Sequence, residues 1–164
     1  MKLKNLLPTI ALALLSAFNS QFSILHAQTP SWLNFQGRMV VGGASFNGIG
    51  QFKFAIVNAD GSVTFWSNDG SSANGGEPGN AVPLTLTNGL YSVLLGDTTL
   101  TNMTQPVNPG IFTNAATRLR VWFNDGTNGF ERLTPDQPLA ATPYAMYASA
   151  ANSANSVPAQ NLTG

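Results

Sequence analysis

The chain has 164 residues, of which 43% are hydrophobic and only 9% are charged, with 7 basic residues balancing 7 acidic ones. This length favours a single domain, and the balanced, scattered charge excludes the basic surface that nucleic acids or anionic membranes require. The chain contains no Cys, so its fold must be stable without disulfides. Its 10 Phe and 3 Trp carry too much apolar surface for a disordered chain, so we expect a packed core.

Residues 1–27 have the layout of a secretory signal peptide. Lys2 and Lys4 precede an apolar run from Leu6 to Phe18, and the segment ends in "LHA" at Ala27. The run is shorter than the ~20 residues that a membrane-spanning helix needs. We therefore expect cleavage near Ala27 and a mature protein that is secreted or on the cell surface, with no membrane segment. The mature chain would lack His as well as Cys.

Seven short segments show the strand pattern, in which apolar and polar residues alternate and β-branched and aromatic residues are enriched. In chain order they are Trp32–Arg38, Ile49–Asn58, Gly61–Asn68, Ala81–Thr87, Leu90–Gly96, Ala116–Asp125 and Gly129–Thr134. The steps Asp60-Gly61, Asn88-Gly89 and Asp125–Gly129 separate consecutive segments and are typical of hairpin turns, because Asn and Gly tolerate positive φ. We predict an all-β domain over residues 28–143, an antiparallel β-sandwich of about seven strands or a partly open barrel.

Two longer loops interrupt the pattern. Residues 69–80 are rich in Gly and predict a mobile loop. Residues 97–112 are also long, but they carry large apolar side chains that could pin the loop to the core, namely Leu100, Met103, Ile111 and Phe112.

The chain after Glu131 changes character. Pro135, Pro138 and Pro143 exclude a helix through this stretch and disfavour a central strand, so we expect an extended surface segment with Leu139 as a buried clip. Residues 144–164 are mostly Ala, Ser and Asn. They are either a flexible linker or a short helix at the start of an oligomeric stalk, in which Tyr144, Tyr147 and Ala151 would share one face.

Catalytic and metal chemistry find little support in the sequence. The expected mature chain has neither the commonest general base nor a thiol nucleophile. Asp60, Asp69, Asp125 and Glu131 lie in turn contexts, where a carboxylate usually caps its own backbone. The Asp-rich turns lack the ligand spacing of a calcium loop. We predict that the protein is not an enzyme and uses no cofactor or metal.

Four residues are candidates for ligand binding. If Leu119, Val121 and Phe123 face the core, the opposite face of their strand carries Arg118, Arg120 and Trp122. A Trp beside two Arg could stack on a sugar ring or serve a protein interface. Trp66, on another predicted strand, could bind a ligand in the same way. The alternative, which we favour, is that both Trp rings are covered, by the proline-rich segment or by a second sheet.

Four stretches resemble a module found at the N-termini of large secreted proteins of environmental bacteria. They are "NFQGRM" at Asn34–Met39, "FWSN" at Phe65–Asn68, "NGLYSVLLG" at Asn88–Gly96 and "LTPDQPLAATPYAMYA" at Leu133–Ala148, although that family usually has a basic residue where this chain has Asp136. The resemblance implies a β-sandwich head followed by a collagen-like or tail-fibre-like stalk, and it carries no catalytic residues.

The residues and the resemblance together predict a non-enzymatic structural or adhesive module at the head of a surface fibre. Its expected partners are further copies of itself, through the C-terminal segment, and a surface glycan or protein. The alternative function is a carbohydrate-binding module that uses exposed aromatic side chains.

Overall fold

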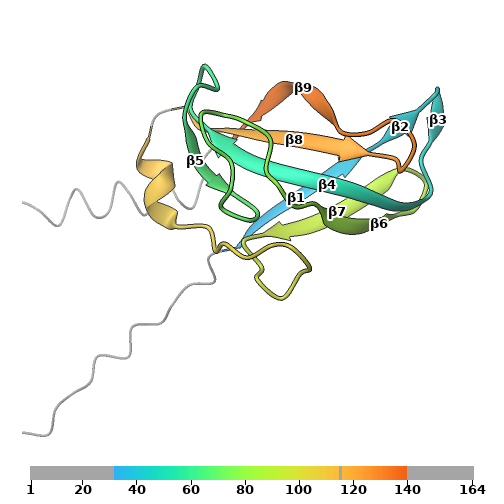
Figure 1. Cartoon of the computed structure of the whole chain (residues 1–164), viewed down its shortest axis with the longest axis horizontal. Helices are drawn as coiled ribbons and strands as arrows, with labels where there is room; N and C mark the ends of the chain where they lie inside the picture. Colours follow the sequence, from blue (N-terminus) through green and yellow to red (C-terminus); the bar gives the residue numbers. More distant parts are fainter. Residues whose placement is uncertain (1–31, 115, 140–164) are drawn as a thin grey trace, which may run out of the picture. The chain divides into compact units, whose positions relative to one another are not determined.

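The computed structural model describes residues 32–114 and 116–139, so the predicted signal peptide and the segment 144–164 lie outside the described residues. Within these ranges the chain forms nine strands and one short 3-10 helix (Figure 1). The elements are β1 (Leu33–Arg38), β2 (Val40–Val41), β3 (Ala44–Ser45), β4 (Gly48–Val57), β5 (Thr64–Ser67), β6 (Val82–Leu86), β7 (Leu90–Leu95), η1 (Pro109–Thr113), β8 (Arg118–Asn124) and β9 (Glu131–Pro138). The all-β prediction is confirmed, and each of the seven predicted segments contains or overlaps a strand. The ribbon of β2 and β3 was not predicted.

The ten-residue strand β4 organises the largest sheet. It pairs along one edge with β8, which in turn pairs with β9. Its other edge is shared, because the first half of β4 pairs with β6 and the last three residues pair with β5. A second sheet consists of β1 and β7, and β2 pairs with β3 in a small third sheet. All of these pairings are antiparallel, as the hairpin turns predicted.

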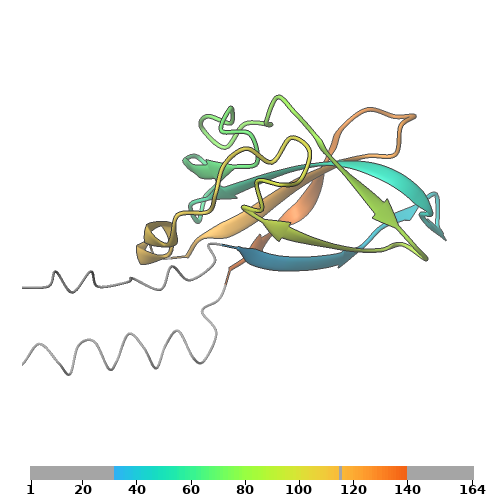
Figure 2. The ribbon, with the colours of Figure 1, turned by 90° about the horizontal axis from the view of Figure 1, so that it is seen from below.

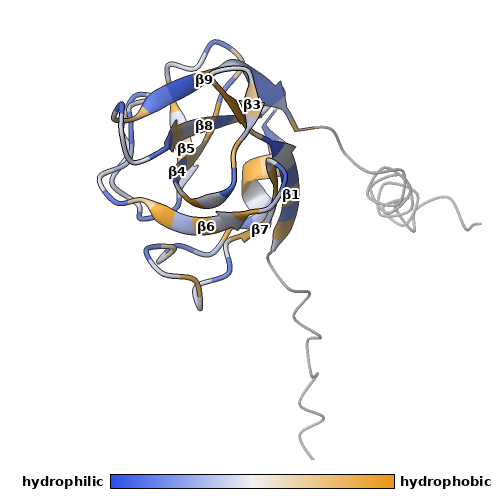
Figure 3. Ribbon diagram, turned by 90° about the vertical axis from the view of Figure 1, so that its right-hand side faces the viewer, coloured by the Kyte–Doolittle hydropathy of each residue, from blue (hydrophilic) through white to orange (hydrophobic). Residues whose placement is uncertain are grey.

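The turn at Asn88-Gly89 passes the chain from the large sheet to the second one. Asn88 and Gly89 have φ of 53° and 79°, as a tight two-residue hairpin turn requires, and Thr87 and Leu90 exchange backbone hydrogen bonds across it. The two strands then part, because β6 pairs with β4 whereas β7 pairs with β1. Viewed nearly along the strands, the strands lie side by side on a curve, in the order β9, β8, β4, β6, β7 and β1 (Figure 3).

The core fills the space inside this curve. Phe52 lies near its centre, with its ring centroid 4.5 Å from that of Tyr91 and 5.0 Å from that of Phe123. Burial raises the pKa of Tyr91 to about 12. The other buried side chains alternate along the strands as predicted and include Phe54, Ile56, Val82, Leu86, Val93, Leu95, Leu119 and Val121. Each contributes about 1.5–3 kcal/mol when fully buried, which explains how a chain without disulfides can remain folded.

The proline-rich segment is an edge strand, which refines the prediction of a merely extended surface segment. Glu131–Pro138 pairs with β8 on one side, and Pro is tolerated in a strand at an edge. The pairing is interrupted at Arg120, since Leu119 lies opposite Gln137 and Val121 lies opposite Leu133. The resulting bulge turns Asp136 toward β8. Leu139 packs against the core, as predicted.

The long loop after β7 is pinned to the core mainly as expected. Met103 is fully buried, and Leu100 and Ile111 pack against the core cluster. Phe112 departs from the prediction, because 44% of it is exposed.

The first strand begins and the last strand ends at the same end of the sheets. Leu33 lies opposite Leu95, the last residue of β7, and Pro138 lies opposite Arg118, the first residue of β8 (Figure 2). The opposite end carries three turns, those between β2 and β3, between β6 and β7, and between β8 and β9. None of the helical residues described here forms a helix long and apolar enough to cross a membrane.

Candidate functional site

The predicted ligand-binding residues Arg118, Arg120 and Trp122 do share the outer face of β8, opposite its core-facing residues. They do not form an open platform. Trp122 is only 5% exposed, because it packs with Ala55 and Val57 and is covered by Phe130 from the loop between β8 and β9. Trp122 is therefore covered, as the favoured alternative expects, but the cover comes from the adjoining hairpin and not from the proline-rich segment or a second sheet.

Trp66 is also buried, at 6% exposure, and it belongs to the core. The pairing explains why. Trp66 lies opposite Ile56 and Thr64 lies opposite Val57, so Phe65 is an extra residue that bulges out of β5. The bulge rotates Trp66 into the core, and its indole N–H donates to the carbonyl oxygen of Gln105 at 2.9 Å. Simple alternation along the sequence could not reveal this, because one bulged residue reverses the face of those beyond it.

Arg120 holds a loop onto the outer face of the large sheet. Its Nη1 donates to the carbonyl oxygens of Gly61 at 3.1 Å and Gly75 at 2.7 Å. Its Nε and Nη2 donate to the carboxylate of Asp136, the closest contact being 2.7 Å. Each of the three guanidinium nitrogens is engaged by the fold, so Arg120 is a structural clamp and offers no free donor fork to a ligand.

Two glycines make this clamp possible. Gly61 and Gly75 have φ of 75° and 69°, which other residues rarely adopt. A Cβ on Gly61 would collide with the Arg120 guanidinium, and a Cβ on Gly75 would collide with the carbonyl oxygen of Gly61. The sequence showed these glycines only as turn residues.

The Gly-rich loop 69–80 is tied down in several further places, which does not support the prediction of a mobile loop. Lys53 forms an ion pair with Glu77 at 2.6 Å and lies 4.0 Å from the centre of the Phe130 ring. Asp69 Oδ2 accepts hydrogen bonds from the backbone and side-chain nitrogens of Asn80. The loop therefore covers part of the outer face of the sheet.

Asn68 joins both long loops to β4, a role that its sequence context did not indicate. It is fully buried. Its Oδ1 accepts from the backbone N–H of Phe54, and its Nδ2 donates to the carbonyl oxygens of Asn80 and Asn102. Its own carbonyl oxygen accepts from Thr104. Each polar atom of this buried side chain is thus satisfied, as burial of an amide requires.

Arg118 is half buried, and its Nε is buried with no hydrogen-bond partner among the residues that the structure describes. It contributes to no cluster with Arg120, whose donors point to the loop and to Asp136. The four candidate residues therefore do not form a single ligand site.

The carboxylates that the sequence singled out mostly cap turns, as the residue pattern predicted. Oδ1 of Asp60 accepts from the backbone and hydroxyl of Ser62, and Oδ1 of Asp69 accepts from the same groups of Ser71. Hydrogen bonds from Ser62 lower the pKa of Asp60. The pKa of Asp69 is also lowered: burial opposes this, but the hydrogen bonds from Ser71 and Asn80 outweigh it.

Asp125 follows the same pattern. Its Oδ1 accepts from the backbone N–H groups of Thr127 and Asn128, and these bonds lower its pKa. Glu131 is exposed at the start of β9. Within residues 32–114 and 116–139, no group of three or more His, Cys, Asp or Glu side chains is placed to hold a metal ion.

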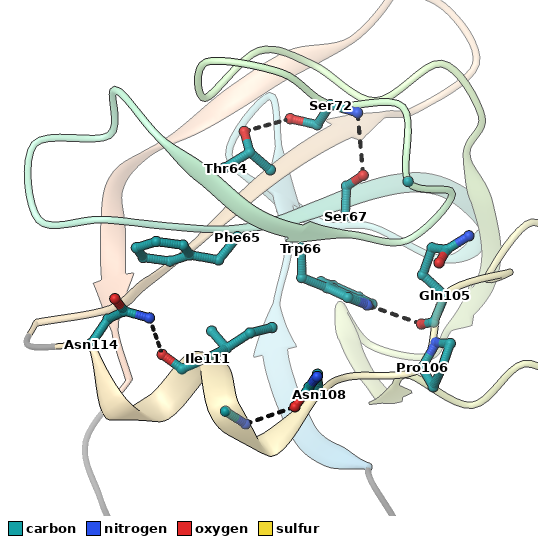
Figure 4. Close-up of a pocket in the computed structure, with 12 residues that line it drawn as sticks. Thr64, Phe65, Trp66, Ser67, Ser72, Gln105, Pro106, Asn108, Ile111 and Asn114 are labelled. Atoms are coloured by element: carbon teal, nitrogen blue, oxygen red, sulfur yellow. Dashed lines mark hydrogen bonds between the residues drawn. The ribbon is translucent and has the colours of Figure 1, made fainter.

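A hollow with a volume of about 550 Å³ lies beside β5 (Figure 4). We refer to it as the β5 pocket. Its walls are strand β5, the start of the loop 69–80, and the segment 105–114 that contains η1. The lining residues are Thr64, Phe65, Trp66, Ser67, Gly70, Ser72, Gln105, Pro106, Asn108, Gly110, Ile111 and Asn114. None of them carries a charge. Sequence reasoning missed this site because its walls come from three separate segments.

Comparison with known proteins gives one family. A model of a domain of unknown function (DUF8740) matches residues 34–136, from β1 to the Asp136 that pairs with Arg120. Searches of curated proteins and of solved structures gave no match.

Proposed function

Since the chain belongs to the DUF8740 family, whose function is unknown, we propose a role from its own residues: a secreted, non-enzymatic structural or adhesive module that forms the head of a surface fibre. The proposal includes a signal peptide at residues 1–27, a β-sandwich head, and association of several copies through residues 144–164. It agrees with the resemblance of the four sequence stretches to heads of secreted stalk proteins.

One observation carries the proposal. The chain enters β1 and leaves β9 at the same end of the sheets, whereas three turns occupy the far end. A domain whose two ends leave together can sit at the end of a stalk and present its far end outward.

The polar chemistry of the domain supports a structural role. Arg120 and Asp136 hold a loop and an edge strand, and Lys53 of β4 forms an ion pair with Glu77 of the same loop. The carboxylates of the turns are kept ionised by hydrogen bonds, whereas a general acid needs a pKa raised toward the working pH. The ionisable groups are thus used to fix the fold.

The test is the mass in solution of residues 28–164 beside that of residues 28–143, by light scattering. The proposal expects an oligomer for the longer chain and a monomer for the shorter one, both with the same thermal unfolding midpoint of the β domain. Replacing Tyr144 and Tyr147 by Ser in the longer chain should weaken the oligomer. If both chains are monomers at high concentration, the assembly part of the proposal fails.

The alternative of a carbohydrate-binding module using Trp122 and Trp66 is not favoured, because both rings are buried. The β5 pocket is a more suitable place for a saccharide than either Trp ring.

A further inference from the structure

The β5 pocket has walls that are fixed by the fold. The indole of Trp66 holds the carbonyl of Gln105, and the carbonyl of Asn68 accepts from the N–H groups of Thr104 and, at 3.3 Å, of Gln105. On the other side, the N–H of Ser72 donates to the hydroxyl of Ser67 at 3.2 Å. These bonds tie the two loop walls to β5, so the hollow exists before any ligand arrives. A preformed hollow of about 550 Å³ falls within the usual size range of small-ligand sites.

Three exposed amide side chains lie at the rim with hydrogen-bonding capacity to spare. Asn108 uses its Oδ1 to accept from Gly110, and Asn114 uses its Nδ2 to donate to Ile111. Among the residues described, no hydrogen bond is made by Nδ2 of Asn108 or Oδ1 of Asn114, and Gln105 makes only one long side-chain contact, of 3.5 Å, to Thr104. A donor, an acceptor and a whole amide therefore remain available around one hollow (Figure 4).

An aromatic side chain completes the lining. Phe65, the bulged residue of β5, lines the hollow and is half buried. Ile111 from η1 is also half buried and lines the same hollow. A partly exposed apolar wall beside neutral amides suits a ligand that is apolar on one face and rich in hydroxyl groups at its edge.

We infer that the β5 pocket binds a neutral saccharide. The C–H face of a sugar ring would lie on Phe65 and Ile111, while its hydroxyl groups would exchange hydrogen bonds with Gln105, Asn108 and Asn114. The absence of charge in the lining disfavours anionic ligands such as phosphates or acidic sugars, because nothing would replace the water lost from their charge.

An extended peptide is a less suitable occupant. It would bind by adding a strand to the open edge of β5. That edge is only four residues long and contains a bulge, and the segment 105–114 already lies alongside it.

The inference goes beyond the structural role and can fail separately from it. The assembly experiment measures mass, whereas this one measures binding, and a monomeric domain could still bind a saccharide.

The experiment titrates residues 28–164 with neutral oligosaccharides of glucose, galactose, mannose and N-acetylglucosamine. Affinity is measured by calorimetry, and the binding position is found from NMR shifts of backbone amides. We expect at least one saccharide to bind, with the shifts concentrated in residues 64–72 and 105–114. Sialylated versions of the same oligosaccharides should bind no more tightly than the neutral ones.

The pocket variant is Gln105→Ala with Asn114→Ala, which keeps the backbone carbonyl that accepts from Trp66. Affinity should fall at least about tenfold, since two hydrogen bonds are lost. The matched control is Asn34→Ala with Gln36→Ala, which removes the same two side-chain types from exposed positions on β1 and should leave affinity unchanged.

Two results would overturn the inference. One is that no neutral saccharide binds at concentrations up to about 10 mM, which corresponds to a binding free energy weaker than about −3 kcal/mol. The other is that binding occurs but survives in the pocket variant, or shifts amides elsewhere. Unchanged thermal unfolding of the variant ensures that a loss of binding is not a loss of fold.

Discussion

Asn68 is the residue at which β4 and both long loops meet. Its side chain forms hydrogen bonds with the N–H of Phe54 and with the carbonyls of Asn80 and Asn102, and Asn68 is fully buried. A buried network of this kind is stable only when every member has a partner. The sequence context indicated that Asn68 belongs to a turn. It did not indicate the bond to Asn102, because that residue is 34 positions away.

We predict that Asn68→Ala lowers the free energy of unfolding by about 2–4 kcal/mol, because one buried N–H and two carbonyls lose their partner. Asn68→Asp should be comparably harmful, since it keeps the acceptor but aims a carboxylate at two carbonyl oxygens. Urea denaturation measures both. Asn34→Ala is the control: its exposed side chain makes only a 3.5 Å contact with Ser92, so a change within about 0.5 kcal/mol is expected. Equal effects of Asn68→Ala and Asn34→Ala would contradict the assigned role.

The loop 69–80 and the edge strand β9 depend on each other through Arg120. The bulge in β9 brings Asp136 to one side of the guanidinium, and the loop brings Gly75 to the other. The sequence contained both partners, yet their separation along the chain and the irregular pairing at the bulge concealed the contact. A loop rich in Gly thus becomes ordered through its backbone, because close approach needs residues without a Cβ.

We predict that Arg120→Lys lowers the free energy of unfolding by about 3 kcal/mol, because an ammonium cannot bind a carboxylate and two carbonyls in the guanidinium geometry. Amide hydrogen exchange should accelerate in residues 69–80 more than in β4. Arg132→Lys is the matched control. Arg132 lies 3.6 Å from the same Asp136, but its side chain is 45% exposed, so the variant should change stability little. Unchanged exchange in the loop of Arg120→Lys would show that other contacts hold it.

Three turns of the domain are capped by an Asp side chain in the same way. Asp60, Asp69 and Asp125 each accept hydrogen bonds from groups two residues onward, and each has a lowered pKa. A carboxyl whose pKa is lower in the folded state stabilises that state above its ordinary pKa, here 3.8, and this contribution is lost as the pH falls through the folded value. The folded state of the domain should therefore become less stable in acid.

We predict that the thermal unfolding midpoint falls as the pH drops below about 5 and through the lowered pKa values of these carboxyls. In the triple variant Asp60→Asn, Asp69→Asn and Asp125→Asn the dependence should be flatter, since Asn can cap a turn but does not titrate in this range. Thermal unfolding followed by circular dichroism gives both curves. The interpretation fails if the triple variant keeps the slope of the parent chain.

The sequence by itself determined the all-β class, seven of the strands, the three tight turns and the inward-facing residues of β4 and β8. These features are local, since alternation and positive φ depend on near neighbours. Only the tertiary structure decided that β6 and β7 part into different sheets and that Trp66 and Trp122 are buried. It also decided that Arg120 clamps a loop and that a neutral pocket forms beside β5. Each of these depends on a bulge or on contacts between distant segments, and one inserted residue in a strand reverses every face beyond it.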